Sequence, residues 1–80
     1  MTKLELIKEE ATKRYYYAMN SNNAVELDGA VYDMHESIKE IRESKELMSS
    51  YGVFSVLSML DLFETSLTTH SYIVKRYKED

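Results

Sequence analysis

Apolar residues recur at spacings of three and four along three segments of the chain, which is the spacing of one face of a helix. In the second and third segments the pattern continues for more than three heptads, interrupted in the second only by Lys45. We call each such line of apolar positions a seam. Two seams joined by a short turn are typical of an antiparallel helical hairpin. The three predicted helices cover residues 3–19, 24–48 and 53–78.

Local signals mark the ends of these helices. Thr2 and Glu5 form a capping box that starts the first helix. The tetrad at residues 20–23 ends it and starts the second, because asparagine tolerates the left-handed conformation and is also a good N-cap. At residues 49–52 a turn is expected, with Gly52 able to take a positive φ. We therefore predict one all-α domain over residues 1–80, a three-helix bundle in which the short N-terminal helix packs on the hairpin.

The position of the turn predicts which residues face each other across the hairpin. With its centre near residues 50 and 51, facing positions have numbers that add to about 101. Large side chains then meet small ones at the open end, as a packed core prefers. The expected facing pairs are Tyr77 with Ala24, Val74 with Leu27 and Phe63 with Ile38.

The second predicted helix also contains a glycine. Gly29 lowers helix stability by about 1 kcal/mol relative to alanine. We expect it to mark a close approach by the first helix or by a second chain, unless it is simply tolerated.

The composition makes self-association an expectation. The chain has 80 residues, no cysteine and two histidines, so neither disulfides nor a Cys/His zinc site can supplement its small core. Between Leu47 and Val74 only Asp61 and Glu64 are charged, and apolar residues there lie outside the seam. A helix that is apolar on several faces needs several partners. Either the first helix and its tyrosines cover these faces, or the chain forms a homo-oligomer through Phe54, Leu57, Met59, Leu62 and His70.

The net charge of −4 is concentrated on the second predicted helix, where four carboxylates at spacings of three and four share a column opposite the apolar seam. One interpretation is an acidic face that binds a basic protein partner, including a DNA-binding protein by mimicry of phosphates. The alternative is a solvated face whose carboxylates pair with Lys39 and Arg42. Direct DNA binding is not expected of this charge. The column consists of Asp33, Glu36, Glu40 and Glu43.

Three consecutive tyrosines follow two basic residues in the first predicted helix. Tyr15 belongs to the core stripe, whereas Tyr16 and Tyr17 point elsewhere and, with Tyr32, complete the expected partner-binding surface. Packing at the edge of the core is the simpler alternative for these tyrosines. Basic groups beside aromatic rings also bind nucleotides, so a rival function is an oligomer that sequesters a small anionic ligand between protomers. Its site would be Lys13, Arg14, Tyr16 and Tyr17.

The histidines do not indicate a metal site. His35 and Glu36 open a metalloprotease-like helix motif, but Lys39 occupies the position of the second zinc ligand. His70 lies in the seam, with Asp33 or Thr69 as its expected partner. If His70 is buried and neutral, association should weaken as the pH falls towards 6. No nucleophile–base pair or glycine-rich phosphate loop is present, so we expect no enzymatic activity, cofactor or metal.

Taken as a whole, the sequence predicts a small cytoplasmic protein that binds and regulates or inhibits another macromolecule. Its size, charge and layout resemble the compact regulators and inhibitors of bacteriophages and mobile elements, a likeness of class only. A purely structural assembly protein is a further alternative. Charged residues interrupt the first ten positions, and the longest charge-free run covers residues 47–60, so neither a secretory leader nor a membrane span is expected.

Overall fold

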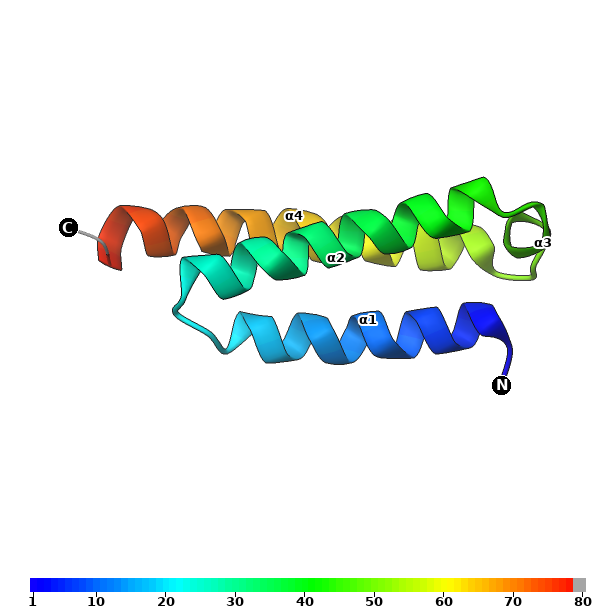
Figure 1. Cartoon of the computed structure of the whole chain (residues 1–80), viewed down its shortest axis with the longest axis horizontal. Helices are drawn as coiled ribbons and strands as arrows, with labels where there is room; N and C mark the ends of the chain where they lie inside the picture. The colour runs from blue at the N-terminus through cyan, green and yellow to red at the C-terminus, as the bar shows by residue number, and fades with distance from the viewer. Residues whose placement is uncertain (79–80) are drawn as a thin grey trace.

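The structure, a computed structural model, describes residues 1–78, which form helices joined by short loops and contain no strand. The helices are α1 (Lys3–Met19), α2 (Ala24–Glu43), α3 (Lys45–Met48) and α4 (Val53–Lys78). The long helices α2 and α4 run antiparallel, and α1 lies alongside both of them (Figure 1). The prediction of an all-α bundle, with an N-terminal helix packed on a helical hairpin, is confirmed.

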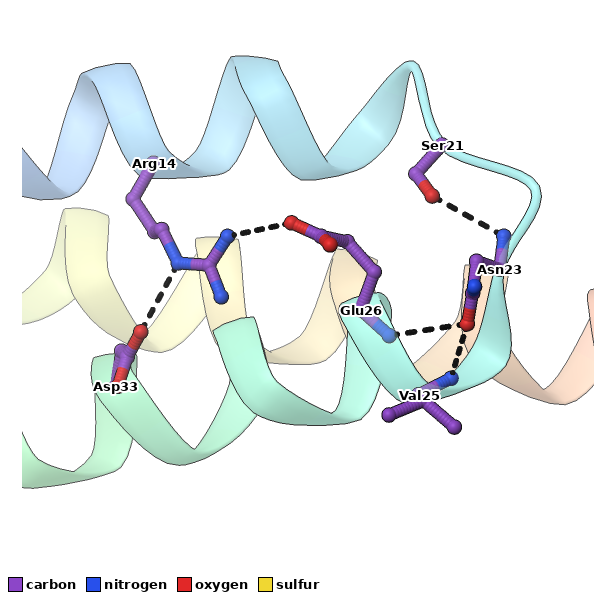
Figure 2. Close-up of polar contacts among 6 residues, drawn as sticks. All are labelled: Arg14, Ser21, Asn23, Val25, Glu26 and Asp33. Atoms are coloured by element: carbon purple, nitrogen blue, oxygen red, sulfur yellow. Dashed lines mark hydrogen bonds and ion pairs between the residues drawn. The ribbon is translucent and has the colours of Figure 1, made fainter.

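Side-chain caps and one glycine set the starts of α1, α2 and α4 where the sequence predicts them. The Glu5 amide donates to the Thr2 hydroxyl oxygen at 3.1 Å, which closes the first turn of α1. At the start of α2, Asn23 Oδ1 accepts hydrogen bonds from the amides of Val25 and Glu26 (Figure 2). Before α4, Gly52 adopts a φ of +80°, the left-handed conformation expected of it.

The prediction of a continuous helix over residues 24–48 is wrong at its carboxyl end. The helix is interrupted at Ser44, which has extended dihedral angles of φ −105° and ψ 115°. The Ser44 hydroxyl oxygen accepts a hydrogen bond from the Leu47 amide at 3.2 Å and so caps α3. A continuous helix would keep Lys45 in the apolar seam. The break leaves Lys45 exposed and buries Leu47 instead, which explains why the seam has a charged residue at this point.

The core runs along the whole length of the bundle. Alanines of α1 allow that helix to lie close to the hairpin, which contributes the larger side chains. The Cα atoms extend over 47 × 19 × 16 Å with a radius of gyration of 13.6 Å, whereas a compact domain of this length has about 12 Å. The bundle is therefore rod-shaped, with long helix faces open to solvent. Fully buried side chains include Ala18, Leu27, Ala30, Ile41, Leu60 and Leu67.

Polar contacts between α2 and α4 confirm the predicted register. Asp28 accepts a hydrogen bond from the Ser71 hydroxyl at 2.6 Å and pairs with the Lys75 ammonium at 2.8 Å. Further along the hairpin, His35 Nδ1 lies 3.5 Å from a carboxylate oxygen of Glu64. The residue numbers in these pairs add to 99 or 103, on either side of the predicted 101.

The end of the α4 seam differs from the prediction. Tyr77, expected to pack against Ala24, is exposed, whereas Ser71 is buried with 2% of its surface accessible. A straight helix drifts by about 20° per heptad relative to a strict seven-residue repeat. Over the three heptads that follow Val53, this drift turns Tyr77 away from the core and brings Ser71 towards α2.

None of the helices between residues 1 and 78 combines the length and the apolar character that a bilayer span requires.

Candidate functional site

A groove of about 400 Å³ lies between α1 and α2. Its apolar part comes from side chains of both helices that border the core, and four carboxylates and one guanidinium surround it. These ionised groups give the lining a net charge of −3, out of −4 for the whole chain. The groove lining is therefore net acidic. It is lined by Ile7, Glu10, Ala11, Arg14, Asp33, Met34, Glu36, Ser37 and Glu40.

Arg14 joins α1 to α2 at one end of this groove. Its Nε donates to Asp33 Oδ2 at 2.9 Å and its Nη1 donates to Glu26 Oε1 at 3.0 Å (Figure 2). The hydrogen bond to Asp33, followed by that to Glu26, raises the pKa of Arg14 above its usual value, so the group stays charged. The third guanidinium nitrogen lies 3.5 Å from the position that a Cβ atom on Gly29 would occupy. The element near Gly29 is α1, but it makes only an ordinary contact through the Arg14 side chain, so the close backbone approach expected at this glycine is not observed.

All four carboxylates of the acidic column are exposed, and α1 supplies cations that pair with two of them. Asp33 is bonded to Arg14, and Glu40 pairs with the Lys3 ammonium of α1 at 3.3 Å. Because α1 packs along one edge of the column, half of its carboxylates face a cation across the groove. Among the ion pairs of residues 1–78, none joins Lys39 or Arg42 to the column, so the alternative of pairing within α2 is not observed. The remaining members, Glu36 and Glu43, are exposed.

Glu10 completes the acidic lining from α1, and the sequence-based selection missed it. It lies four residues before Arg14, so the two side chains share the face of α1 that packs on α2. That spacing is the signal that could have revealed it.

The tyrosines are not gathered into one platform. Tyr15 stacks on Phe63 of α4, with ring centroids 4.1 Å apart and planes at 12°, and Tyr16 meets the Tyr15 ring edge-on at 5.3 Å. Tyr16 thus extends an aromatic contact between α1 and α4. Tyr17 and Tyr32 are exposed on α1 and α2, respectively. Tyr17 points about 100° away from Tyr16, because successive residues of a helix are rotated by that angle. The expected partner-binding residues are therefore distributed over more than one side of the bundle.

Within one chain, the residues of the alternative anion-binding site are already engaged. Arg14 is held by two carboxylates, and Lys13 pairs with Glu9 at 3.6 Å. A phosphate placed beside Arg14 would also face the carboxylates of the groove. These contacts do not support a nucleotide site built from Lys13, Arg14, Tyr16 and Tyr17 of a single protomer.

Three residues expected on the self-association surface occupy other places. Leu57 is 6% exposed and belongs to the core, and Met59 packs against that core. His70 Nε2 donates to the Ser21 carbonyl oxygen at 3.2 Å, which ties α4 to the loop between α1 and α2. The expected partners of His70, Asp33 and Thr69, make no hydrogen bond with it. The sequence could not distinguish these positions, because a helix contacted by two neighbours buries more than one seam.

The other two residues of that predicted surface, Phe54 and Leu62, are exposed on α4.

No group of three His, Cys, Asp or Glu side chains suited to holding a metal ion occurs in the part of the chain that the structure describes. Comparison of the chain with protein-family models, with curated proteins and with solved structures finds no match. The function is therefore inferred from the surface of the molecule itself.

Proposed function

We propose that this protein is a non-enzymatic regulator or inhibitor that binds a basic surface of a protein partner through the acidic groove between α1 and α2. The observation that carries the proposal is the cluster of four carboxylates that line the groove with one guanidinium, which leaves a net negative charge even with the Lys3 ammonium paired to Glu40. Such a field attracts a positively charged surface and orients it during encounter. A cytoplasmic location is in keeping with a chain that has no cysteine.

The groove offers contacts of more than one kind. Exposed carboxylates of Glu10 and Glu36 provide charge at its rim, and the half-buried side chain of Ile7 provides apolar surface between them and the core. Tyr17 and Tyr32 add large exposed rings on the two helices that border it. Exposed aromatic rings, with polar and charged groups at the rim, are typical of protein-binding surfaces.

Close mimicry of a nucleic acid receives less support. The four carboxylates of the column extend over the eleven residues 33–43 of α2, or about one charge per 5 Å of helix axis, against one per 3.4 Å along a nucleic-acid strand. Since Arg14 and Lys3 neutralise Asp33 and Glu40, the effective density is about half of that value. A partner that recognises a small acidic patch fits this surface better than one that requires a continuous line of phosphates.

The proposal is tested by affinity capture with two charge variants of the tagged full-length chain. The first variant, Glu10→Gln with Glu36→Gln, removes two carboxylates of the groove. It keeps the ion pairs of Asp33 with Arg14 and of Glu40 with Lys3. Glu5→Gln with Glu46→Gln changes the net charge equally, and both exposed residues lie outside the groove. Glutamine at position 5 keeps the capping box with Thr2. Proteins retained from an extract of the source cells are identified by mass spectrometry at low and high salt.

We expect at least one partner that the wild type and the control variant retain, and that the groove variant and high salt release. For the purified partner, the groove variant should bind at least about tenfold more weakly, mainly through a slower association rate. Retention of the same proteins by all three chains, or of none by the wild type, would refute the proposal.

A further inference from the structure

Cations of α1 already occupy part of the acidic groove between α1 and α2. Arg14 lines the groove, and its Nε donates to Asp33 Oδ2, a carboxylate of the same lining, at 2.9 Å (Figure 2). Lys3 pairs with a second lining carboxylate, Glu40, at 3.3 Å. Two of the four carboxylates that line the groove are therefore in contact with cations of the protein itself. A basic group of a partner has to replace one of these cations before it can pair with Asp33 or Glu40.

The two carboxylates that hold Arg14 differ in their position. Asp33 belongs to the lining of the groove, whereas Glu26, which accepts from Arg14 Nη1 at 3.0 Å, does not. A partner that takes Asp33 thus leaves Arg14 with its contact to Glu26. This matters because the Arg14 side chain is only 31% exposed, and a half-buried charge without any partner is costly. The second carboxylate therefore lowers the cost of giving up the first.

The docking of α1 onto the hairpin does not rest on Arg14 alone. Apolar contacts hold this helix on both sides of Arg14, and the Tyr15 ring stacks on Phe63 of α4 with centroids 4.1 Å apart. Loss of one hydrogen bond to α2 therefore leaves the helix docked. The buried residues of α1 are Leu4, Ala11 and Ala18.

We propose that Arg14 is an internal competitor for the basic group of a partner. In the free protein it covers Asp33, and when the partner binds it keeps only its contact with Glu26. This inference rests on the proposed function, because it concerns the regulation of the same groove. The contact is autoinhibitory, since it lowers the affinity of the free groove for every cation that cannot replace a guanidinium at Asp33.

The first test is calorimetric titration of the full-length protein with hexa-arginine at low ionic strength, where exposed charges interact most strongly. Arg14→Met uncovers Asp33 and should raise the affinity about threefold to fivefold, near the upper limit for a solvent-screened ion pair. Lys13→Met is the matched control. It changes the net charge equally, but Lys13 lies outside the groove lining and pairs with Glu9 of its own helix, so the affinity should change less than about twofold.

Nuclear magnetic resonance of the wild type tests the exchange without relying on the stability of a variant. The Hε resonance of Arg14 is identified by its absence from the spectrum of Arg14→Met. It should move, and exchange faster with water, as hexa-arginine is added, because the hydrogen bond to Asp33 is lost.

An affinity of Arg14→Met within about twofold of the wild type, or an Arg14 resonance that stays unchanged while the peptide binds, overturns the proposal. The function proposed for the groove then still stands, provided that Glu10→Gln with Glu36→Gln weakens binding of the peptide. If that double variant binds hexa-arginine as tightly as the wild type, or if no chain binds it, the proposed function fails and this inference fails with it.

Discussion

Replacing Arg14 by methionine removes both contacts that connect the groove end of α1 to α2 while keeping an unbranched stem over Gly29. Two charge-assisted hydrogen bonds of 2.9 and 3.0 Å are lost. The Arg14 side chain is 31% exposed, and its partners Glu26 and Asp33 are 35% and 53% exposed, so solvent screens both pairs. Exposed pairs contribute about 0.2–1 kcal/mol each, and this half-shielded geometry places them near the upper end. The free energy of unfolding should fall by about 1–2 kcal/mol.

Urea unfolding followed by circular dichroism measures this change. For a domain of this size, a loss of 1 kcal/mol lowers the melting temperature by about 4–8 °C, which thermal unfolding can check independently. The loss should be larger at low ionic strength than in about 1 M salt, where the Debye length falls to about 3 Å. In a double-mutant cycle with Asp33→Asn, the coupling should be about 0.5–1 kcal/mol, since the two groups are in direct contact.

Lys13→Met is the matched control on the neighbouring position of α1. Lys13 is 76% exposed and pairs with Glu9 of the same helix at 3.6 Å, so its loss should change the stability by less than about 0.5 kcal/mol. If Arg14→Met is no more destabilising than Lys13→Met, the view that Arg14 holds the groove in shape is refuted.

Four further substitutions test the stability of the fold. The Lys75 and Ser71 contacts lower the pKa of Asp28 below its usual 3.8. Above about pH 5 the wild type should therefore have a free energy of unfolding up to about 1 kcal/mol higher than Asp28→Asn, and this difference should disappear as the pH falls through the lowered pKa. A difference that does not change with pH in urea titrations would contradict this. Gly29→Ala should raise the free energy of unfolding by up to about 1 kcal/mol, and with it the melting temperature, because a Cβ atom there makes an ordinary contact. The same change at Gly52, whose φ is +80°, should lower stability by about 1–2 kcal/mol, and changes of the same sign would contradict the assignment. Ser44→Ala should lower stability by about 1 kcal/mol through loss of the α3 cap, measured by thermal unfolding.

The helix ends and the register depend on interactions between residues close in the chain. The caps at Thr2 and Asn23 satisfy the first amides of α1 and α2, and Gly52 supplies the positive φ of the turn, so each could be read from a few neighbouring residues. A short turn between two long seams also leaves little freedom in how they align. These features made the all-α bundle predictable.

The tertiary structure decided everything that depends on where a third helix packs. Arg14 is followed by three tyrosines in sequence, which suggested an anion site, yet folding places it against Asp33, 19 residues away, and Glu26. Periodicity identifies one face of a helix but not how many neighbours cover it, so Leu57 joined the core while Phe54 stayed exposed. The buried face of a straight helix rotates gradually relative to a seven-residue repeat, and in α4 this rotation buries Ser71 and exposes Tyr77. Local backbone preferences determine the elements, and the packing of distant side chains determines which residues remain available to bind.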